Sequence, residues 1–378
     1  MTGAGRGPSG ERPELARTAA LASILHEREL DILLVTNLVN VRYLTGFTGS
    51  SGLALVSADP GAGAPLRFLT DFRYQTQSGE QLPDAFAREI VAGDLLEAAV
   101  RMGAGEGEGR MGFEEADVTF KQHARLCELA APGWGLVPSP DAVERLRAVK
   151  DDIEVARIRA ASELADEALS GVLEAGVVGR TEREVAIDLE LRMRRLGAEA
   201  ASFPSIVAAG AHGALPHARP TGEEIPRDVL VTIDWGALLD GYCSDCTRTY
   251  ATGEHVDAQA KEVYELVLAA QERALAAVKA GPSGRAIDAV ARAVIEAGGH
   301  GEDFGHGLGH GVGLDIHEGP RLSRTAGEYP LLAGNVVTLE PGVYLPGSCG
   351  ARIEDLVVVR EGGAEILTRL AKELTVVA

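Results

Sequence analysis

Apolar residues in the first 140 positions form short runs typical of strands, separated by longer segments with helical spacing. Strand-like runs cover residues 31–36, 52–57 and 66–70, and a helical pattern covers 17–28. Their alternation predicts a mixed α/β module. We therefore expect an N-terminal domain over residues 15–138. Residues 1–14 are rich in Gly, Pro and Arg and lack the apolar core of a signal peptide, so they are expected to form a loose, disordered tail.

A turn-rich stretch, residues 131–140, separates this module from a region with a different pattern. Asp141 has the position of an N-cap for a long helix that ends near residue 174, and further helices are predicted at 181–196 and 258–279. Helices flank apolar strands there, which predicts an α+β domain over residues 139–378. Its two halves repeat the order helices, strand, acidic residue and return strand, so an internal duplication is a further hypothesis.

Composition narrows the classes of partner. The 36 basic and 56 acidic residues give a formal net charge of −20, which disfavours nucleic acid and anionic membrane surfaces. No apolar run is long enough to span a bilayer. Four cysteines are too few for a disulfide framework, so a reducing cytoplasm is expected. Cys243 and Cys246 form a C-x-x-C, but a strand would point them to opposite faces, which favours small core residues over a zinc or redox pair.

Acidic residues interrupt the apolar runs of the second domain, where an unpaired charge is costly. Asp234 lies in the strand-like run 229–236, and Asp245 lies in the return run 241–250. A turn centred between residues 239 and 240 would place the two aspartates directly opposite each other. Opposed Cβ atoms lie about 4.5 to 5.5 Å apart, so both carboxylates could share one metal ion or bridge two. Like charges in this position destabilise a sheet unless a cation is present.

A second hairpin is predicted around Pro346-Gly347. Pairing centred on Gly347 places Glu340 opposite Glu354, although the Pro and Gly that follow Glu340 interrupt the ladder. A single pair of carboxylates is more often a solvated loop feature. Two such pairs in one domain favour a cluster, and clustered carboxylates raise one another's pKa values unless cations hold them. Two divalent ions would balance four carboxylates.

Histidines supply further candidate ligands. The Gly-rich stretch 305–318 carries three of them, His306, His310 and His317. Glycine permits close approach of the backbone to a ligand, but this stretch lacks the helix context and the lysine of a phosphate loop, and it is not H-E-x-x-H. His26 and His123 are interpreted as surface or core residues, whereas His217, just ahead of the first acidic strand, could have either kind of role.

Five residues, taken in order, resemble the ligand set of the pita-bread metallopeptidases, which include methionine aminopeptidase, aminopeptidase P and prolidase: Asp234, Asp245, His310, Glu340 and Glu354. Several phrases are similar to the Xaa-Pro peptidase branch: Pro216-His217, His306-Gly-Leu-Gly-His310, His317-Glu318, Glu340-Pro-Gly342, Arg352-Ile-Glu-Asp355 and residues 40–49. The resemblance covers nearly the whole chain. It implies a creatinase-like N-terminal domain, a pita-bread catalytic domain, two Mn or Co ions and a homodimer.

The resemblance also implies an activity, hydrolysis of the Xaa-Pro bond by a metal-bridging hydroxide that attacks the scissile carbonyl. Oxygen-rich ligation independently favours manganese or cobalt over structural zinc. Glu340 is the implied proton shuttle, and His217 and His317 would hold the substrate carbonyl and stabilise the tetrahedral intermediate. His306 and Arg352 are counted as substrate-binding residues, and Arg352 is also expected to orient the ligand carboxylates.

Arg321 resembles an arginine of compact prolidases that lies near the substrate's free carboxylate, which it could grip by two hydrogen bonds. We therefore favour an Xaa-Pro dipeptidase, with an Xaa-Pro aminopeptidase acting on longer peptides as the alternative. A non-catalytic pita-bread binding protein and a metal-free creatinase are remote alternatives, because all five ligands are present. Methionine aminopeptidase fits poorly, since the chain has a long N-terminal domain. Structural roles are favoured for three residues that could instead face a neighbour's site, Asp71, Arg73 and Tyr74.

Overall fold

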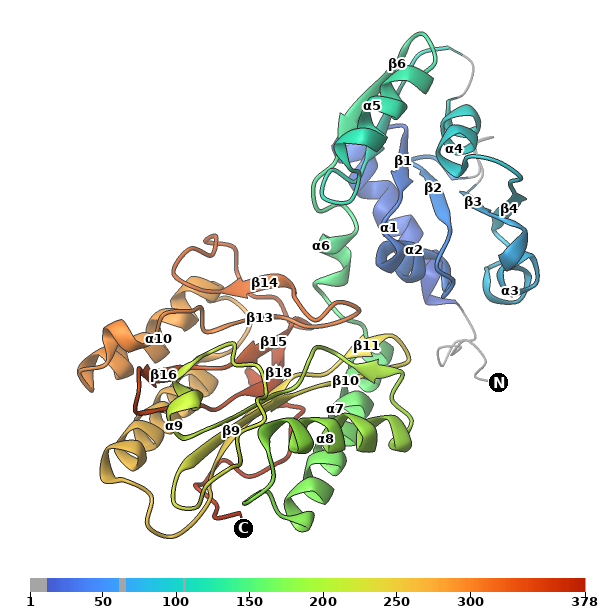
Figure 1. Cartoon of the computed structure of the whole chain (residues 1–378). Coiled ribbons are helices and arrows are strands. Elements are labelled where there is room, and N and C mark those ends of the chain that lie inside the picture. The colour runs from blue at the N-terminus through green and yellow to red at the C-terminus, as the bar shows by residue number, and fades with distance from the viewer. Residues whose placement is uncertain (1–11, 61–65, 105–106, 378) are drawn as a thin grey trace. The chain divides into compact units, whose positions relative to one another are not determined.

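A computed structural model describes residues 12–60, 66–104 and 107–377 (Figure 1). The chain divides into two compact units, Met1–Arg147 and Ala148–Ala378. This division falls later than the boundary predicted after residue 138, because Glu144 and Arg147 hydrogen bond to Asn40 of the first unit. Most of the predicted tail lies outside the described residues, and a helix already begins at Pro13.

The first unit is a six-stranded mixed sheet with helices between its strands, in the order β4-β3-β2-β1-β5-β6. The pairs β1–β2 and β2–β3 are antiparallel, and the other pairs are parallel. The strands are β1 (Ile32–Val35), β2 (Leu53–Ser57), β3 (Leu66–Thr70), β4 (Phe86–Ile90), β5 (Gly109–Phe113) and β6 (Trp134–Pro138). The helices are α1 (Pro13–Glu27), α2 (Leu38–Thr45), α3 (Gln75–Gln81), α4 (Leu95–Gly103), α5 (Phe120–Leu129) and α6 (Glu144–Arg147). The three predicted strands and the first predicted helix are confirmed.

The long helix of the second unit begins later than predicted. Asp151 caps α7 (Asp152–Ala175), and its carboxylate and the side chain of Glu154 form a reciprocal capping box. Asp141 instead has φ of +52°, in the left-handed region, so it does not have the extended backbone of an N-cap. The prediction of a helix starting at Asp141 is therefore wrong at its start and right at its end.

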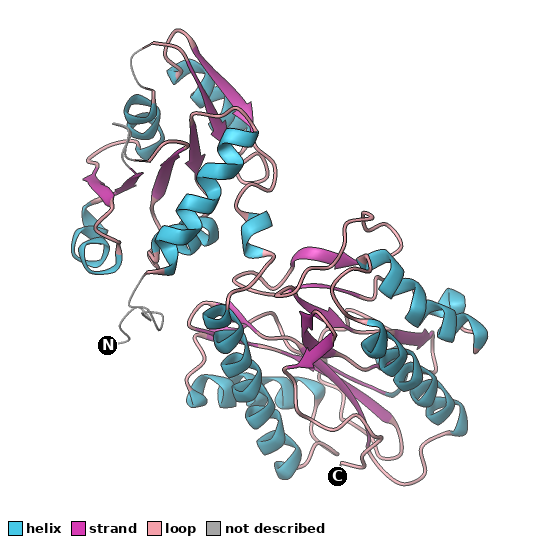
Figure 2. Cartoon of the chain, turned by 180° about the vertical axis from the view of Figure 1, so that it is seen from behind, coloured by secondary structure: helices cyan, strands magenta, loops and turns pink. Residues whose placement is uncertain are grey.

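Two predicted helices are confirmed as α8 (Glu182–Leu196) and α9 (Ala258–Ala277). A further helix, α10 (Gly284–Ala297), was not predicted. Helices α7 and α8 pack against β9 (Leu230–Trp235) through one apolar cluster, and a second cluster joins α9 and α10 to β15 (Val336–Leu339) and β18 (Asp355–Arg360). The helix pairs therefore cover the strands that carry the acidic residues, as the second unit in Figure 2 shows.

The remaining strands of this unit are short. They are β7 (Ala200–Ala201), β8 (Ile206–Ala209), β10 (Ala237–Leu239), β11 (Tyr242–Cys243), β12 (Cys246–Ala251), β13 (Gly309–Gly311), β14 (Glu318–Leu322), β16 (Gly342–Leu345), β17 (Cys349–Arg352) and β19 (Gly363–Ile366). Together with β9, β15 and β18 they form four sheets, ordered β11-β10-β7, β12-β9-β8, β14-β13-β15-β18-β19 and β16-β17.

The first acidic hairpin has a different register from the predicted one. Asp234 of β9 lies opposite Thr247 of β12, not opposite Asp245, because the turn is centred on Asp240-Gly241. Both turn residues have positive φ, 49° and 80°, as a two-residue hairpin of the I′ type requires. The error is two residues, so it preserves the face on which each side chain lies.

The second acidic hairpin has the predicted register. Val343 pairs with Ala351 in one ladder, and Leu339 pairs with Asp355 in the next, both centred on Gly347. Glu340 and Glu354 lie at the break between these two ladders. The first hairpin is also interrupted between β9–β12 and β10–β11, at Gly236 on one strand and at Ser244 and Asp245 on the other, whereas Asp234 lies within the β9–β12 ladder.

All four cysteines lie in the described ranges and are free thiols. Cys243 and Cys246 are buried in different apolar clusters, which confirms that the C-x-x-C residues point to opposite sides of their strands. Within the described residues, no helix combines the length and the apolar character needed to cross a bilayer.

Candidate active site

Three carboxylates from the two hairpins meet in the second unit. Ligand oxygens of Asp234, Asp245 and Glu354 all lie within 4.8 Å of one another. Asp234 comes from β9, Asp245 directly precedes β12, and Glu354 occupies the break between β17 and β18. The diagonal offset of Asp234 and Asp245 still keeps both side chains on one face, so the misplaced turn leaves the predicted grouping intact.

His310 and Glu340 complete the cluster. Nε2 of His310 lies 3.6 Å from a carboxylate oxygen of Asp245 and 3.4 Å from one of Glu340, both longer than a normal hydrogen bond. Nδ1 of His310 lies 3.0 Å from the carbonyl oxygen of Gly311, which orients the ring. Burial lowers the pKa of His310 to about 4, so its imidazole is neutral at pH 7, the form that binds metals.

The carboxylates of this cluster outnumber the cationic side chains that contact them in the described residues. Burial raises the pKa of Asp245 and of Glu354 well above their ordinary values, and neighbouring carboxylates add to both shifts. Burial raises the pKa of Glu340 to about 7. Asp234 Oδ1 and Glu354 Oε1 are buried without a hydrogen-bond partner in the described part of the chain. Buried, unpaired oxygens beside a neutral imidazole fit the donor set of divalent cations such as manganese.

Arg352 provides the one strong positive contact to this cluster among the described residues. Its Nη2 donates to Asp234 at 2.7 Å, and its Nε donates to the Thr247 hydroxyl at 3.1 Å. Thr247 in turn donates to Glu354 at 2.7 Å. Arg352 Nη1 donates to the Tyr344 hydroxyl at 2.9 Å, and that hydroxyl lies 2.9 Å from His306 Nε2.

The sequence did not identify Tyr344 or Thr247 as part of the site. Thr247 could have been found, because it lies two residues after Asp245 on the same strand face. Tyr344 had no signal in the sequence, since its hydroxyl meets Arg352 and His306 only through the fold. His306, a predicted substrate-binding residue, makes hydrogen-bond contacts through both ring nitrogens, to Tyr344 and to the carbonyl oxygen of Gly307.

The other predicted residues lie around the rim of this cluster. The His317 ring lies 4.4 Å from the His310 ring, centroid to centroid. Burial lowers the pKa of His317, and the charges of Arg321 and His217 lower it further, so both residues are near it. Arg321 and His217 are exposed. His217 lies on a loop that touches the site, because Pro216 accepts a hydrogen bond from Arg352 at 3.1 Å.

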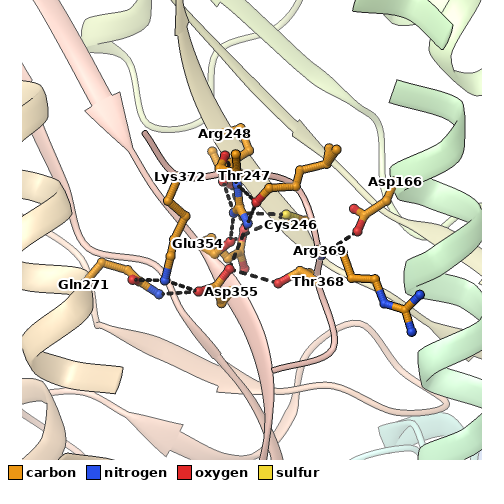
Figure 3. A network of polar contacts seen from close by, with 12 residues as sticks. Asp166, Cys246, Thr247, Arg248, Gln271, Glu354, Asp355, Thr368, Arg369 and Lys372 are labelled. Atoms are coloured by element: carbon orange, nitrogen blue, oxygen red, sulfur yellow. Dashed lines mark hydrogen bonds and ion pairs between the residues drawn. The ribbon is translucent and has the colours of Figure 1, made fainter. Parts of the chain in front are cut away.

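A saturated polar network backs the ligand strands (Figure 3). Arg248 donates to the Asp355 carboxylate at 2.9 Å and also to the main-chain oxygen of Glu354. Asp355 accepts three further hydrogen bonds, from Gln271, Thr368 and Lys372. Thr247 and Glu354 thus contact the cluster, while the residues that follow them, Arg248 and Asp355, lie in the network behind it, as the period of two in a strand requires.

A pita-bread fold that gathers buried carboxylates and a neutral imidazole around one point defines a metal-dependent hydrolase. Residues 156–361 match Metallopeptidase family M24, and residues 17–149 match the Creatinase/Prolidase N-terminal domain. The chain therefore belongs to Metallopeptidase family M24 and is of the prolidase type, which confirms the predicted fold class and the predicted family.

Several known proteins resemble the whole chain. An uncharacterized peptidase of Bacillus subtilis is 40% identical, over 94% of this chain and 98% of its own length. The structure of an Xaa-Pro dipeptidase from Bacillus anthracis has a TM-score of 0.90 and 37% identity, covering 96% of this chain and all of that chain. An X-Pro aminopeptidase from Thermotoga maritima has a TM-score of 0.83 and 36% identity, covering 93% and 99%.

Proposed function

We propose that the chain is a dinuclear metallopeptidase that cleaves Xaa-Pro dipeptides. The observation that carries the proposal is the cluster of two buried carboxylates, two partly buried carboxylates and one neutral imidazole, which leaves two carboxylate oxygens without hydrogen-bond partners in the described residues. We infer that Asp234, Asp245, His310, Glu340 and Glu354 hold two divalent ions, with manganese or cobalt favoured by the oxygen-rich donors. Bound ions would polarise the scissile carbonyl and lower the pKa of a water molecule.

Residues of the chain are proposed to transfer the proton, bind the substrate carbonyl and orient a metal ligand. Glu340 is proposed to accept a proton from the attacking water and to deliver it to the departing proline nitrogen. His217 and His317 are proposed to hold the substrate carbonyl oxygen. Arg352 is proposed to orient Asp234 through their 2.7 Å hydrogen bond and to oppose the rise that burial causes in the pKa of Asp234.

Arg321 supports the preference for dipeptides. Its guanidinium is exposed on β14 and has no ion-pair partner in the described residues, yet its charge lowers the pKa of His310 and of His317. An unpaired guanidinium beside the site is suited to bind a free carboxylate by two hydrogen bonds. In a dipeptide that carboxylate belongs to the proline itself.

An Xaa-Pro aminopeptidase is the second candidate. The dipeptidase and the aminopeptidase structures above resemble this chain almost equally, at 37% and 36% identity, so overall similarity does not separate the two activities. The predicted homodimer and cytoplasmic location remain part of the proposal.

The testing experiment uses protein stripped of metal with a chelator, assayed on an Xaa-Pro dipeptide before and after addition of Mn²⁺. We expect activity to return with metal in the wild type and to stay at least about 100-fold lower in Glu340→Gln. Calorimetric titration should give two ions per chain. Failure to cleave any Xaa-Pro peptide despite bound metal would reject the substrate assignment while leaving the metal site in place.

A second assay separates the two candidates. Arg321→Met should raise KM for an Xaa-Pro dipeptide by about 10-fold and change KM for a longer Xaa-Pro peptide by less than about 2-fold. Arg324→Met is the matched control, because Arg324 is an exposed arginine nearby that pairs with Glu296. Equal wild-type turnover of the short and long peptides would favour the aminopeptidase.

A further inference from the structure

The loop that carries His217 is closed at its base by one buried carboxylate. Glu182, the first residue of α8, is 2% exposed. One carboxylate oxygen accepts the backbone N–H of Ala209 at 2.9 Å, and the other accepts the backbone N–H of Thr221 at 2.9 Å and its hydroxyl at 2.7 Å. Ala209 and Thr221 are the two ends of the loop, so a single side chain joins them.

His212 adds a third contact inside the loop. Its Nδ1 lies 2.8 and 2.9 Å from the two carboxylate oxygens of Glu182 and donates to them. Backbone bonds extend the same attachment, because the N–H of Glu182 donates to the carbonyl of Glu223 and that of Arg183 to the carbonyl of Thr221. The carboxylate also lies at the N-terminus of α8, where the helix dipole favours a negative charge.

The far side of the loop rests on the site. A Cβ atom at Gly350 of β17 would lie only 2.1 Å from the carbonyl oxygen of Gly213, so the two backbones touch. Pro216 accepts a hydrogen bond from Arg352, and Arg352 also holds Asp234. The loop is therefore fixed at its base by Glu182 and near its tip by Arg352, with exposed His217 directly after the second anchor.

We infer that Glu182 is a positioning residue for His217, acting through the 209–221 loop. This inference rests on the proposed role of His217 at the substrate carbonyl. Glu182 does not contact the five candidate ligands in the described structure, and its partners all lie on the loop or the segment that follows it. A looser loop would misplace an imidazole that needs accurate alignment, and a displacement of about 1 Å can cost about 100-fold in rate.

The first test compares Mn-loaded Glu182→Gln with Glu184→Gln. Glu184 is the matched control, because it lies on the same helix turn and, among the described residues, its carboxylate bonds only to Thr181. We expect kcat/KM on an Xaa-Pro dipeptide to fall by 10- to 100-fold in Glu182→Gln and by less than about 3-fold in the control, with metal content unchanged in both. His212→Gln, a milder change at a partly exposed side chain, should lose activity in the same direction if Glu182→Gln folds poorly.

A double-mutant cycle then asks whether Glu182 acts through His217. In a His217→Ala background, Glu182→Gln should lower kcat/KM by less than about 3-fold further, because the group it positions is already absent. If the fold-losses in kcat/KM of the two single variants multiply in the double variant, the inference is overturned and Glu182 has a general structural role.

Hydrogen exchange provides a readout independent of activity. In the metal-stripped protein, amides of residues 209–221 should exchange faster in Glu182→Gln than in the wild type or in Glu184→Gln, with β9 and β12 unchanged. Unchanged exchange in the loop would overturn the inference. If the wild type cleaves no Xaa-Pro peptide, the proposed function fails, and this measurement still decides whether Glu182 holds the loop.

Discussion

Glu354 and Asp355 are adjacent carboxylates, both buried, with opposite electrostatic surroundings. Burial raises the pKa of Glu354 well above its usual value, and the charges of Glu340 and Asp234 raise it further. Burial also raises the pKa of Asp355, but Arg248, Lys372 and Thr368 outweigh this and hold it below its usual value. One oxygen of Glu354 has no hydrogen-bond partner in the described residues, whereas both oxygens of Asp355 have at least two.

The difference shows two functions of buried charge in adjacent residues where β18 begins. The face with Glu354 is incomplete without cations and is suited to bind them. The face with Asp355 is neutralised by the protein itself and holds β12 to β18 and to the segment that follows β19 (Figure 3). A change at Glu354 should therefore weaken metal binding and stabilise the metal-stripped protein. A change at Asp355 should instead lower the stability of the protein.

The largest expected effect is the loss of activity in Glu354→Gln. We expect turnover of an Xaa-Pro dipeptide to fall by about 1,000-fold or more, because a proposed metal ligand is removed. Metal-stripped Glu354→Gln should nevertheless melt a few degrees higher than metal-stripped wild type at pH 8, because one of several clustered negative charges is gone. A lower melting temperature in the stripped variant would contradict the account of this face.

Asp355→Asn should chiefly affect stability. Removing one partner leaves Arg248 buried without its counter-charge, which costs about 3 to 5 kcal/mol. Urea unfolding of the Mn-loaded variant and wild type measures the difference. A loss below about 1 kcal/mol would show that the network behind the ligands does not hold the strands together.

The carboxylates of the two faces should contribute differently to the pH dependence of folding stability in metal-stripped protein. Carboxylates with raised pKa values, such as Glu340 at about 7, stay protonated in the folded state at a pH where the unfolded chain releases the proton. The stability that these carboxylates contribute should therefore fall as the pH rises from about 4.5 to about 7, while buried His306 and His310, whose pKa values are lowered to about 4, oppose part of this fall. Asp355 behaves oppositely: its pKa is lowered, so its contribution is present above its ordinary value and is lost only on stronger acidification.

Melting temperatures between pH 5 and pH 8 test this expectation. Buried Glu114 and Asp166, with raised pKa values of about 7 and about 6, add a similar decline to every sample. The difference between Mn-loaded and metal-stripped protein removes their contribution. That difference should grow by several degrees as the pH rises, and a constant difference would contradict the raised pKa values of the candidate ligands.

The smallest expected effect is that of Lys372→Met. Lys372 bonds to Asp355 at 2.7 Å, but its side chain is 19% exposed and Arg248 remains to neutralise the carboxylate. We expect a loss of about 1 kcal/mol in unfolding free energy and activity within about 2-fold of wild type. A larger loss of activity than of stability would mean that the network acts on the chemistry directly.

The two hairpins show what local patterns could predict. The second was placed in register because Gly347 marks its turn and the ladders on both sides of the break share one centre. The first hairpin differs from the predicted register by two residues, because Asp240-Gly241 forms its two-residue turn with positive φ at both positions. The side chains of Asp234 and Asp245 still meet in the structure, since a shift of two residues keeps every side chain on its face.

Other features were beyond local reasoning. Helix α7 begins at Asp152 because α6 remains attached to the first unit through Asn40, a contact between residues far apart in the sequence. Tyr344 and Glu182 gain their significance from partners on other elements, so neither their identity nor their spacing marked them. The local sequence pattern therefore indicates the candidate ligands, whereas the residues that position them or the neighbouring loop are defined by tertiary contacts.

The candidate ligands come from both halves of the second unit. Retention of metal ions would therefore test whether the two halves are correctly folded and docked. Asp234 and Asp245 come from one half of the second unit, and His310, Glu340 and Glu354 come from the other. The hydrogen bond from Arg352 to Asp234 joins residues 118 positions apart. A one-residue slip in either hairpin would turn its carboxylates away from the shared face. With the proposed ligands, only molecules with both halves folded and docked in register would keep a full set of ions, and tightly bound metal would mark the correctly folded fraction of a preparation.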